Sequence, residues 1–329
     1  MVVLIRDHRP SWFGRFVSAC LSVIAAILVL SLLAWLTGRT VSDRYGWSQW
    51  LLWIPTPAAL FAATLGLMIS WRRCSHPPIR RRRVLLWLCC LASLGMHFSL
   101  IEHHMFRVPR ENAAGVRVVH WNATHVKGEE PDAYRRAIMQ AEGDLTILTD
   151  AGSIPWHPDI NDWLGEGAFT HRSHPFTILS RIPILTMRVL IAKDEIYVLL
   201  LQIDTTASLG RPLLIYAADM PSDLTIARAE LARDVRRMLD ELDAPPPDLV
   251  IGDFNITRDA ASLDIMFPGY RHAYREVGSG YGATFHTRFP LYHIDHALLG
   301  ESASAEQYEL IAPHVGRHHM QTVTVTIRQ

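Results

Sequence analysis

The chain has 329 residues and equal numbers of basic and acidic side chains, with 32 Lys and Arg against 32 Asp and Glu. The neutrality is a cancellation, because residues 1–114 carry 13 Lys and Arg against 4 Asp and Glu, a net of +9, whereas residues 115–329 carry 19 against 28, a net of −9. An acidic second half argues against tight, non-specific binding to nucleic acid, which needs several cationic contacts to phosphates.

Three apolar stretches precede residue 107. Residues 16–37 hold no charge and are long enough to cross a hydrocarbon core of about 30 Å as a helix. Residues 50–70 follow, with Pro55 and Pro57 near the start, where a helix tolerates proline best, and residues 84–101 form a shorter third stretch. No small-residue cleavage site follows the first stretch. We therefore expect three transmembrane helices in a membrane region of residues 1–106, the first being a retained anchor.

The loop charges predict an orientation. Arg6, Arg9 and Arg15 precede the first stretch, and six arginines lie between residues 72 and 83, whereas the loop between the first two stretches holds only Arg39 and Arg44. Because basic loops stay in the cytoplasm, three crossings place everything after residue 106 outside it, in a multi-pass protein of the plasma (inner) membrane. The basic cluster at residues 80–83 would alternatively bind anionic lipid.

The second half, after a polar linker at residues 107–115, reads as an α/β layered domain. Helices are expected at residues 131–141 and 224–242, the latter with Ser222 and Asp223 as an N-cap. The expected strands are residues 116–121, 145–148, 177–179, 184–190, 197–203, 213–217, 249–251, 294–299 and 322–327.

The stretch at residues 249–255 concentrates the chemistry. A short apolar strand leads to Gly252, expected to allow a tight turn, and then to Asp253 and Asn255. Residues two apart in a strand point to one side, so a carboxylate and a carboxamide would share a pocket floor. The Asp can orient a water and the Asn can donate to a phosphoryl oxygen. The alternative is a turn that merely closes the strand.

Polar residues also follow the other expected strands. As isolated residues they are ordinary loop or cap residues, but together they predict one cleft assembled from several strand ends. Their oxygen atoms suit Mg²⁺ or Mn²⁺, and the absence of cysteine and of an H-x-x-x-H helix from this half disfavours zinc. These residues are Asn122, Asp150, Asp219, Asp253, Asn255, Asp295 and His319.

The order of motifs resembles the endonuclease/exonuclease/phosphatase superfamily, the metal-dependent fold of DNase I-like nucleases and phosphatases. Residues 118–122 are similar to its first motif, residues 176–184 to an internal strand and turn, residues 252–255 to its most diagnostic motif, and residues 294–296 to its "IDH" strand. Residues 270–284 resemble bacterial members with membrane helices ahead of the catalytic domain. The resemblance implies a DNase I-like four-layer α/β sandwich over residues 116–329.

The resemblance also implies roles. Asn122 and Asp150 would hold a divalent cation, although Asp150 is one methylene shorter than the family's Glu. Asp253 would orient the attacking water, and Asn255 would hold the phosphate.

A terminal "SDH" motif falls on residues 317–319, so His319 is the expected catalytic histidine and Asp295 would fix its tautomer. Where the family has a phosphate-contacting His this chain has Asp219, and where it has the Asp of "SDH" this chain has His318. The two exchanges are complementary, so we expect Asp219 and His318 to face each other across the cleft.

The leading functional hypothesis is a membrane-anchored, extracytoplasmic, metal-dependent phosphoesterase acting on a phosphorylated lipid or envelope intermediate. A nuclease of the same family is the enzymatic alternative. The non-enzymatic alternative is a binding or scaffold domain whose site has eroded, which the substitutions at Asp150, Asp219 and His318 favour.

Overall fold

Two six-stranded sheets packed face to face form the second half of the chain in the computed structural model, which describes residues 12–73, 77–110, 113–124 and 129–328. The first sheet has the order β11-β12-β1-β2-β4-β3 and the second β5-β6-β7-β8-β10-β9. The strands of the first sheet are β1 (Val116–Asn122), β2 (Leu145–Thr149), β3 (Phe169–Ser173), β4 (Phe176–Ser180), β11 (Ala303–Ile311) and β12 (Met320–Ile327). Those of the second are β5 (Ile184–Lys193), β6 (Ile196–Ile203), β7 (Leu213–Asp219), β8 (Leu249–Asp253), β9 (Arg271–His272) and β10 (Asp295–Leu299).

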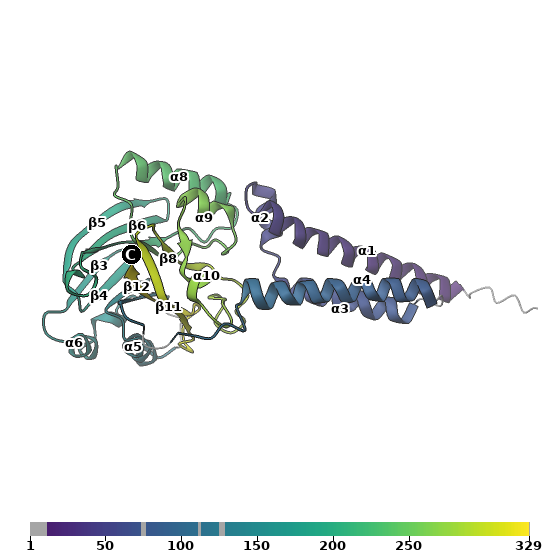
Figure 1. Cartoon of the computed structure of the whole chain (residues 1–329), viewed down its shortest axis with the longest axis horizontal. Coiled ribbons are helices and arrows are strands. Elements are labelled where there is room, and N and C mark those ends of the chain that lie inside the picture. Colours follow the sequence, from purple (N-terminus) through teal and green to yellow (C-terminus); the bar gives the residue numbers. More distant parts are fainter. Residues whose placement is uncertain (1–11, 74–76, 111–112, 125–128, 329) are drawn as a thin grey trace, which may run out of the picture.

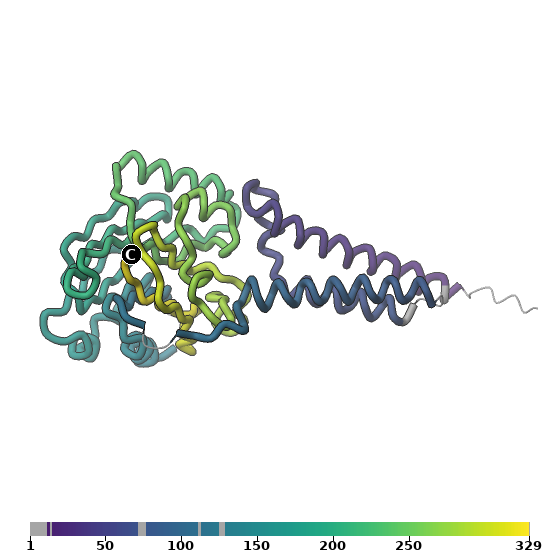
Figure 2. Tube along the Cα trace, viewed as in Figure 1, coloured from purple at the N-terminus to yellow at the C-terminus, as the bar shows by residue number. Residues whose placement is uncertain are grey.

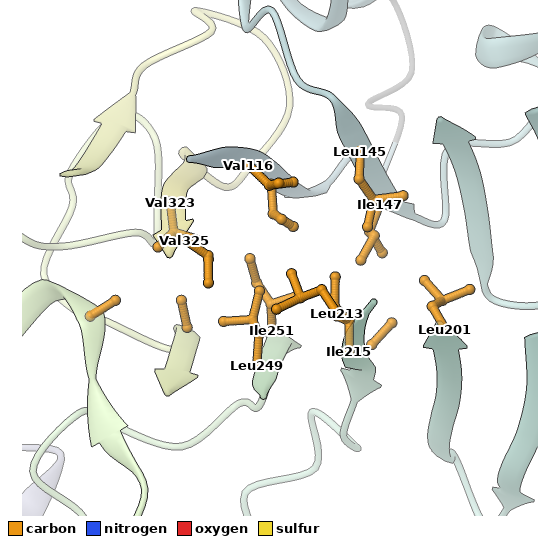
Figure 3. Close-up of a cluster of buried hydrophobic side chains, with 14 of the residues drawn as sticks. Val116, Leu145, Ile147, Leu201, Leu213, Ile215, Leu249, Ile251, Val323 and Val325 are labelled. Atoms are coloured by element: carbon orange, nitrogen blue, oxygen red, sulfur yellow. The ribbon is translucent and has the colours of Figure 1, made fainter. Parts of the chain in front are cut away.

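Apolar side chains from both sheets meet in one core (Figure 3). Leu249 and Ile251 of β8 point into this core, whereas Val250 between them points to the outer face. Because β8 is buried on both faces, its sequence is a continuous apolar run with no polar alternation. β8 pairs parallel with β7, as β1 does with β2, so the carboxyl ends of these four strands lie at one edge of the sandwich.

Helices cover both outer faces and complete four layers (Figure 1). α8 (Arg228–Glu241) and α9 (Ala261–Met266) pack on the second sheet, and α5 (Pro131–Gln140) and α6 (Pro158–Leu164) pack on the first. Shorter helical turns lie in the connections. They are η2 (Ile154–Trp156), α7 (Thr206–Leu209) and α10 (Ala273–Val277).

Each predicted strand is present, while β3, β9 and β11 were missed. The predicted helix 224–242 begins only at Arg228, with Ala227 as its N-cap. The buried Arg228 guanidinium donates to the carbonyl oxygens of Pro221 (2.8 Å) and Asp223 (3.1 Å), which holds residues 221–227 as a loop. The carboxylate of Asp223 instead accepts from the backbone N–H of Thr225.

Residues 12–73 and 77–102 are mainly helical, and their helices lie beside the sandwich or extend away from it (Figure 1). They are α1 (Trp12–Val41), α2 (Gly46–Leu52), α3 (Thr56–Arg73), α4 (Pro77–Met96) and the π-helical turn η1 (His97–Glu102). Arg15–Val41 and Pro77–Glu102 are each long and apolar enough to cross a membrane. The third predicted span, residues 50–70, is instead two helices bent by 67°, since the chain turns at Trp53–Pro55 and proline disfavours helix in the residue before it.

α1, α3 and α4 run side by side away from the sheets, and the basic residues 72–83 lie at the far end of α3 and α4 (Figures 1 and 2). The described start of α1, with Arg15, lies at the same far end. Arg6 and Arg9 lie outside the described residues. The predicted orientation relative to a membrane stays a prediction.

α2 and its flanking turns pack on the domain. Leu52 is 2% exposed and belongs to the apolar cluster under α8. Gln49 donates to the carbonyl oxygen of Leu224 at 2.8 Å and accepts from the N–H of Arg228 at 3.0 Å. Asp43 accepts from the hydroxyl and the N–H of Ser262. The loop between α1 and α3 is therefore part of the packing of the domain.

Gly252 does not make a turn, contrary to the sequence prediction. It lies within β8, paired with Ala218 of β7, and a Cβ added to it would lie 1.8 Å from the carbonyl oxygen of Ala218. Glycine is required here because the two backbones approach closely.

We predict that Gly252→Ala separates β7 from β8 and lowers the free energy of unfolding by about 1–3 kcal/mol. The measurement is the thermal unfolding midpoint of the detergent-solubilised full chain. Gly95→Ala is the matched control, because an added Cβ there meets nothing within 4 Å. Equal midpoints for the two variants would contradict the prediction.

Candidate active site

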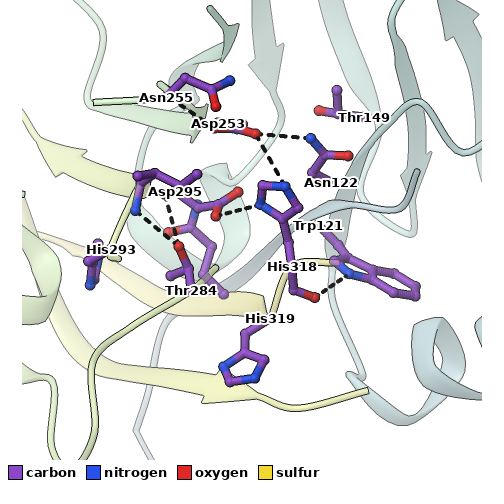
Figure 4. Close-up of polar contacts among 12 residues, drawn as sticks. Trp121, Asn122, Thr149, Asp253, Asn255, Thr284, His293, Asp295, His318 and His319 are labelled. Carbon is purple, nitrogen blue, oxygen red and sulfur yellow. Dashed lines mark hydrogen bonds and ion pairs between the residues drawn. The ribbon is translucent and has the colours of Figure 1, made fainter. Parts of the chain in front are cut away.

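A cleft of about 400 Å³ lies where the carboxyl ends of β1, β2, β7 and β8 meet. Six of the eight predicted site residues line it, Asp295 is fully buried, and His319 is not among the lining residues (Figure 4). The six are Asn122, Asp150, Asp219, Asp253, Asn255 and His318.

Asp253 and Asn255 share the cleft, as predicted, but a turn rather than strand alternation brings them together. β8 ends at Asp253, and Asn255 has a left-handed backbone with φ of 49°. The Asp253 Oδ1 accepts from the N–H of Asn255 at 2.9 Å, and the Asn255 amide donates to the carbonyl oxygen of Met220 at 2.9 Å. These two bonds fix both side chains.

Asn122 connects the two sheets at the floor of the cleft. Its Nδ2 donates to Asp253 Oδ2 at 2.9 Å, and its Oδ1 accepts from the hydroxyl of Thr124 at 2.6 Å. Both ends of the amide are thus engaged. Asn122 orients Asp253, and its oxygen would have to be shared between Thr124 and any cation.

His318, and not His319, is the histidine paired with Asp295. The His318 Nδ1 donates to Asp295 Oδ2 at 2.9 Å, and its Nε2 lies 3.7 Å from Asp253 Oδ2. The indole N–H of Trp121 donates to the His318 carbonyl oxygen at 3.0 Å, which fixes the backbone. An imidazole held at one nitrogen by a buried carboxylate, with the other facing a cleft, can exchange a proton with a substrate.

His319 points away from this pair (Figure 4) and donates to the carbonyl oxygen of Ala283 at 3.1 Å. The predicted alignment is therefore wrong by one residue. His318 takes the position expected for the catalytic histidine, and Arg317, which lines the cleft, takes the position expected for the Asp of "SDH". The proposed complementary exchange between residues 219 and 318 loses its basis, although Asp219 does lie in the same cleft as His318.

The carboxylates of the cleft repel one another. Burial, together with the charges of Asp253, Asp150 and Asp295, raises the pKa of Asp219 to about 8. Burial and the charge of Asp295 raise the pKa of Asp253 to about 6, against the opposing effect of His318.

Burial disfavours the charged ring of His318, but Asp295 and Asp253 outweigh it and raise the pKa of His318 to about 9. For Asp295, burial is likewise outweighed by His318, so its pKa is lowered. The pair is therefore an imidazolium and a carboxylate at neutral pH.

A divalent cation would fit the acidic side of this cleft. Asp150, Asp219 and Asp253 offer oxygen ligands whose mutual repulsion a cation would relieve. Asp253, Asp295 and His318 also offer one ligand atom each, and these three atoms lie within 4.8 Å of one another. There, however, the His318 Nδ1 and Asp295 Oδ2 are already joined by a hydrogen bond, so we assign that group to proton chemistry.

Sequence reasoning missed several residues. Thr284 accepts from the backbone N–H of Asp295 at 3.2 Å, and His174, Glu195 and Tyr197 also line the cleft. Glu195 lies at a hairpin turn between β5 and β6, so only the folded sheet brings it to the cleft. Arg317 was quoted in a motif but given no role.

His293 and His296 lie close to Asp295 in the chain, but both are buried and neither lines the cleft. Each ring bonds to a backbone carbonyl oxygen, that of Gly282 and that of Ile256 respectively. Burial lowers the pKa of both rings, that of His296 to about 4.

The assignment of His318 predicts unequal effects of two neighbouring substitutions. His318→Ala leaves Asp295 buried without its cationic partner, so the free energy of unfolding should fall by about 3–5 kcal/mol. His319→Ala removes one bond to a carbonyl oxygen and should cost about 1 kcal/mol. Thermal unfolding midpoints of the two full-length variants decide this. A larger loss from His319→Ala would contradict the assignment.

The raised pKa of Asp219 predicts that cation binding releases protons. A carboxyl with a pKa of about 8 is mostly protonated at pH 7, and a cation favours its charged form. The affinity for Mg²⁺ should therefore rise with pH, by up to about tenfold per unit for each proton released. Calorimetry in buffers of different ionisation enthalpy counts the protons. Asp219→Asn should lower the count, and Asp264→Asn, at an exposed position on α9, should not.

No protein-family model and no curated protein matches the sequence. Solved structures do match. An endonuclease/exonuclease/phosphatase from Bacteroides vulgatus is 14% identical, with a TM-score of 0.51 over 66% of this chain and 100% of its own.

A mannosyl-6-phosphatase from Bacteroides thetaiotaomicron is 14% identical, with a TM-score of 0.50 over 64% of this chain and 99% of its own. An endonuclease/exonuclease/phosphatase from Beutenbergia cavernae is 14% identical, with a TM-score of 0.50 over 65% and 72%. The second half of this chain thus has the DNase I-like fold of the endonuclease/exonuclease/phosphatase structures.

Proposed function

We propose that the chain is a membrane-anchored, extracytoplasmic phosphoesterase that depends on Mg²⁺ or Mn²⁺ and acts on a phosphorylated lipid or envelope intermediate. The observation that carries the proposal is the placement of His318. Its ring lies between the buried carboxylate of Asp295 and the cleft carboxylate of Asp253. A purely structural domain has no need for a charged imidazole in that position.

The residues of the cleft divide the reaction between them. Asp253 has a pKa of about 6 and faces the cleft, so at neutral pH it can accept a proton from a water and orient its attack. His318 is charged at the same pH and can donate a hydrogen bond to a phosphoryl oxygen and a proton to the leaving group. Arg317, exposed at the rim, offers a guanidinium to an anionic group of the substrate.

Asp150, Asp219 and Asp253 would hold the cation, with Asn122 orienting Asp253. When bound, the cation supplies neutralisation of the phosphoryl charge and Lewis-acid activation.

The cleft lies next to the segment that we place at the membrane surface. Met220, Pro221 and Ser222 line the cleft, and the same loop continues to Leu224, whose carbonyl oxygen binds Gln49 of α2. The other side of α2 exposes Trp47 and Trp50, which are 59% and 50% exposed. Tryptophan is favoured at membrane interfaces, so α2 would lie in the headgroup region and lipid-linked substrates would reach the cleft.

A nuclease remains the second candidate, because the DNase I-like fold and the cleft chemistry suit any phosphoester. The net charge of −9 over residues 115–329 disfavours duplex DNA.

The test uses the full chain in lipid nanodiscs, because Leu52 and Gln49 belong to the packing of the domain. Phosphomonoesters, phosphodiesters, lipid phosphates, lipid pyrophosphates and supercoiled DNA are assayed with and without Mg²⁺ or Mn²⁺. We expect metal-dependent turnover of a lipid phosphate that falls about 10²- to 10⁴-fold in Asp253→Asn. Asp264→Asn is the control for an exposed carboxylate.

DNA cleavage that is lost in Asp253→Asn, without turnover of lipid phosphates, would favour the nuclease. A folded chain that turns nothing over and binds no cation would favour the eroded scaffold.

A further inference from the structure

The segment that joins β9 to β10 contacts both the membrane region and the catalytic pair. Residues 278–294 follow α10 and contain no helix and no named strand. Such a segment has few regular hydrogen bonds of its own, so its shape depends on what packs against it.

On the membrane side, the contact is made by Trp53, the residue after α2. Its ring centroid lies 4.8 Å from that of Tyr292, and the Tyr292 hydroxyl donates to the Trp53 carbonyl oxygen at 3.2 Å. A second contact follows α4, where the ring of His103 stacks on Tyr281 at 4.1 Å and accepts from the N–H of Gly282 at 3.1 Å.

On the catalytic side, Tyr292 is joined to Phe285 by a pair of backbone bonds. Each N–H donates to the other's carbonyl oxygen, at 2.9 and 3.0 Å. Phe285 in turn bridges to His318 in an antiparallel pair, their rings are 4.9 Å apart, and Phe285 lines the cleft. The neighbouring Thr284 binds the backbone N–H of Asp295. One short segment therefore supports both members of the pair.

We infer that Trp53 and Tyr292 are positioning residues, through which the membrane region holds Phe285 against His318. The membrane helices would then complete the active site in addition to anchoring it. This inference rests on the proposed function for its kinetic test, but the geometry of His318 can also be probed without a substrate.

The kinetic test compares full-length variants in nanodiscs, with the lipid phosphate that the wild-type chain is expected to turn over as the substrate. Trp53→Ala should lower kcat about tenfold or more with little change in KM, because a small misplacement of a catalytic group slows the chemical step. Trp53→Phe keeps a ring against Tyr292 and should recover most of the rate. Trp156→Ala, at an exposed position in η2 outside the cleft lining, is the matched control. Tyr292→Phe removes only the hydroxyl and guards against a variant that fails to fold.

The second measurement follows modification of His318 by diethyl pyrocarbonate at fixed pH, read by mass spectrometry on the tryptic peptide of residues 318–328. A His319→Gln background leaves His318 as the single histidine of that peptide, which separates it from the other histidines of the chain. Trp53→Ala should speed the modification, because Phe285 no longer covers the ring. Wild-type kcat and modification rate in Trp53→Ala, or a change in KM alone, would overturn the inference. If the wild-type chain shows no turnover, the proposed function fails, and the modification rates alone decide the positioning role.

Discussion

The bond between Asp295 and His318 is the interaction on which the site depends. Asp295 is fully buried at the start of β10 in the second sheet, and His318 lies two residues before β12 in the first. A buried carboxylate is costly unless it is paired, and here the partner comes from the other sheet. The bond between Asn122 and Asp253 crosses in the same way. The cleft is therefore a seam between two sheets, and the apolar core that holds the sheets together also sets its geometry.

The charges of the seam explain why a cation would fit one side of it. His318 balances Asp295 and part of the charge of Asp253. For Asp219 the opposing charge of His318 has the smallest effect, and burial together with the charges of Asp253, Asp150 and Asp295 raises its pKa to about 8. Asp253 thus belongs to both groups of the cleft. It interacts with His318 of the proton-exchanging pair and with the carboxylates that would hold a cation. In the proposed metal-bound state, that sharing would couple the charge of the ion to the protonation of His318.

The sequence was sufficient for much of the fold and for the composition of the cleft, because buried strands appear as apolar runs and the site residues follow their ends. It could not decide between His318 and His319. Adjacent residues of extended chain point to opposite sides, so a shift of one residue exchanges their places. The bridge between Phe285 and His318 settles which one faces the cleft, and that bridge joins residues far apart in sequence. The break between α2 and α3 was missed because the apolar run continues across Pro55, so hydropathy does not register the turn that this proline favours.

The packing between the N-terminal helices and the domain is another feature that hydropathy alone does not reveal. Hydropathy divides the chain near residue 106, whereas the packing places Leu52 under α8, Asp43 against Ser262 and Trp53 against Tyr292. The loop between α1 and α3 therefore forms part of the surface of the domain. The same surface continues into the loop that lines the cleft. In the membrane-anchored arrangement that we propose, these direct contacts would fix the distance from the bilayer to the site, which would then favour substrates whose phosphate is held at a constant depth in the membrane.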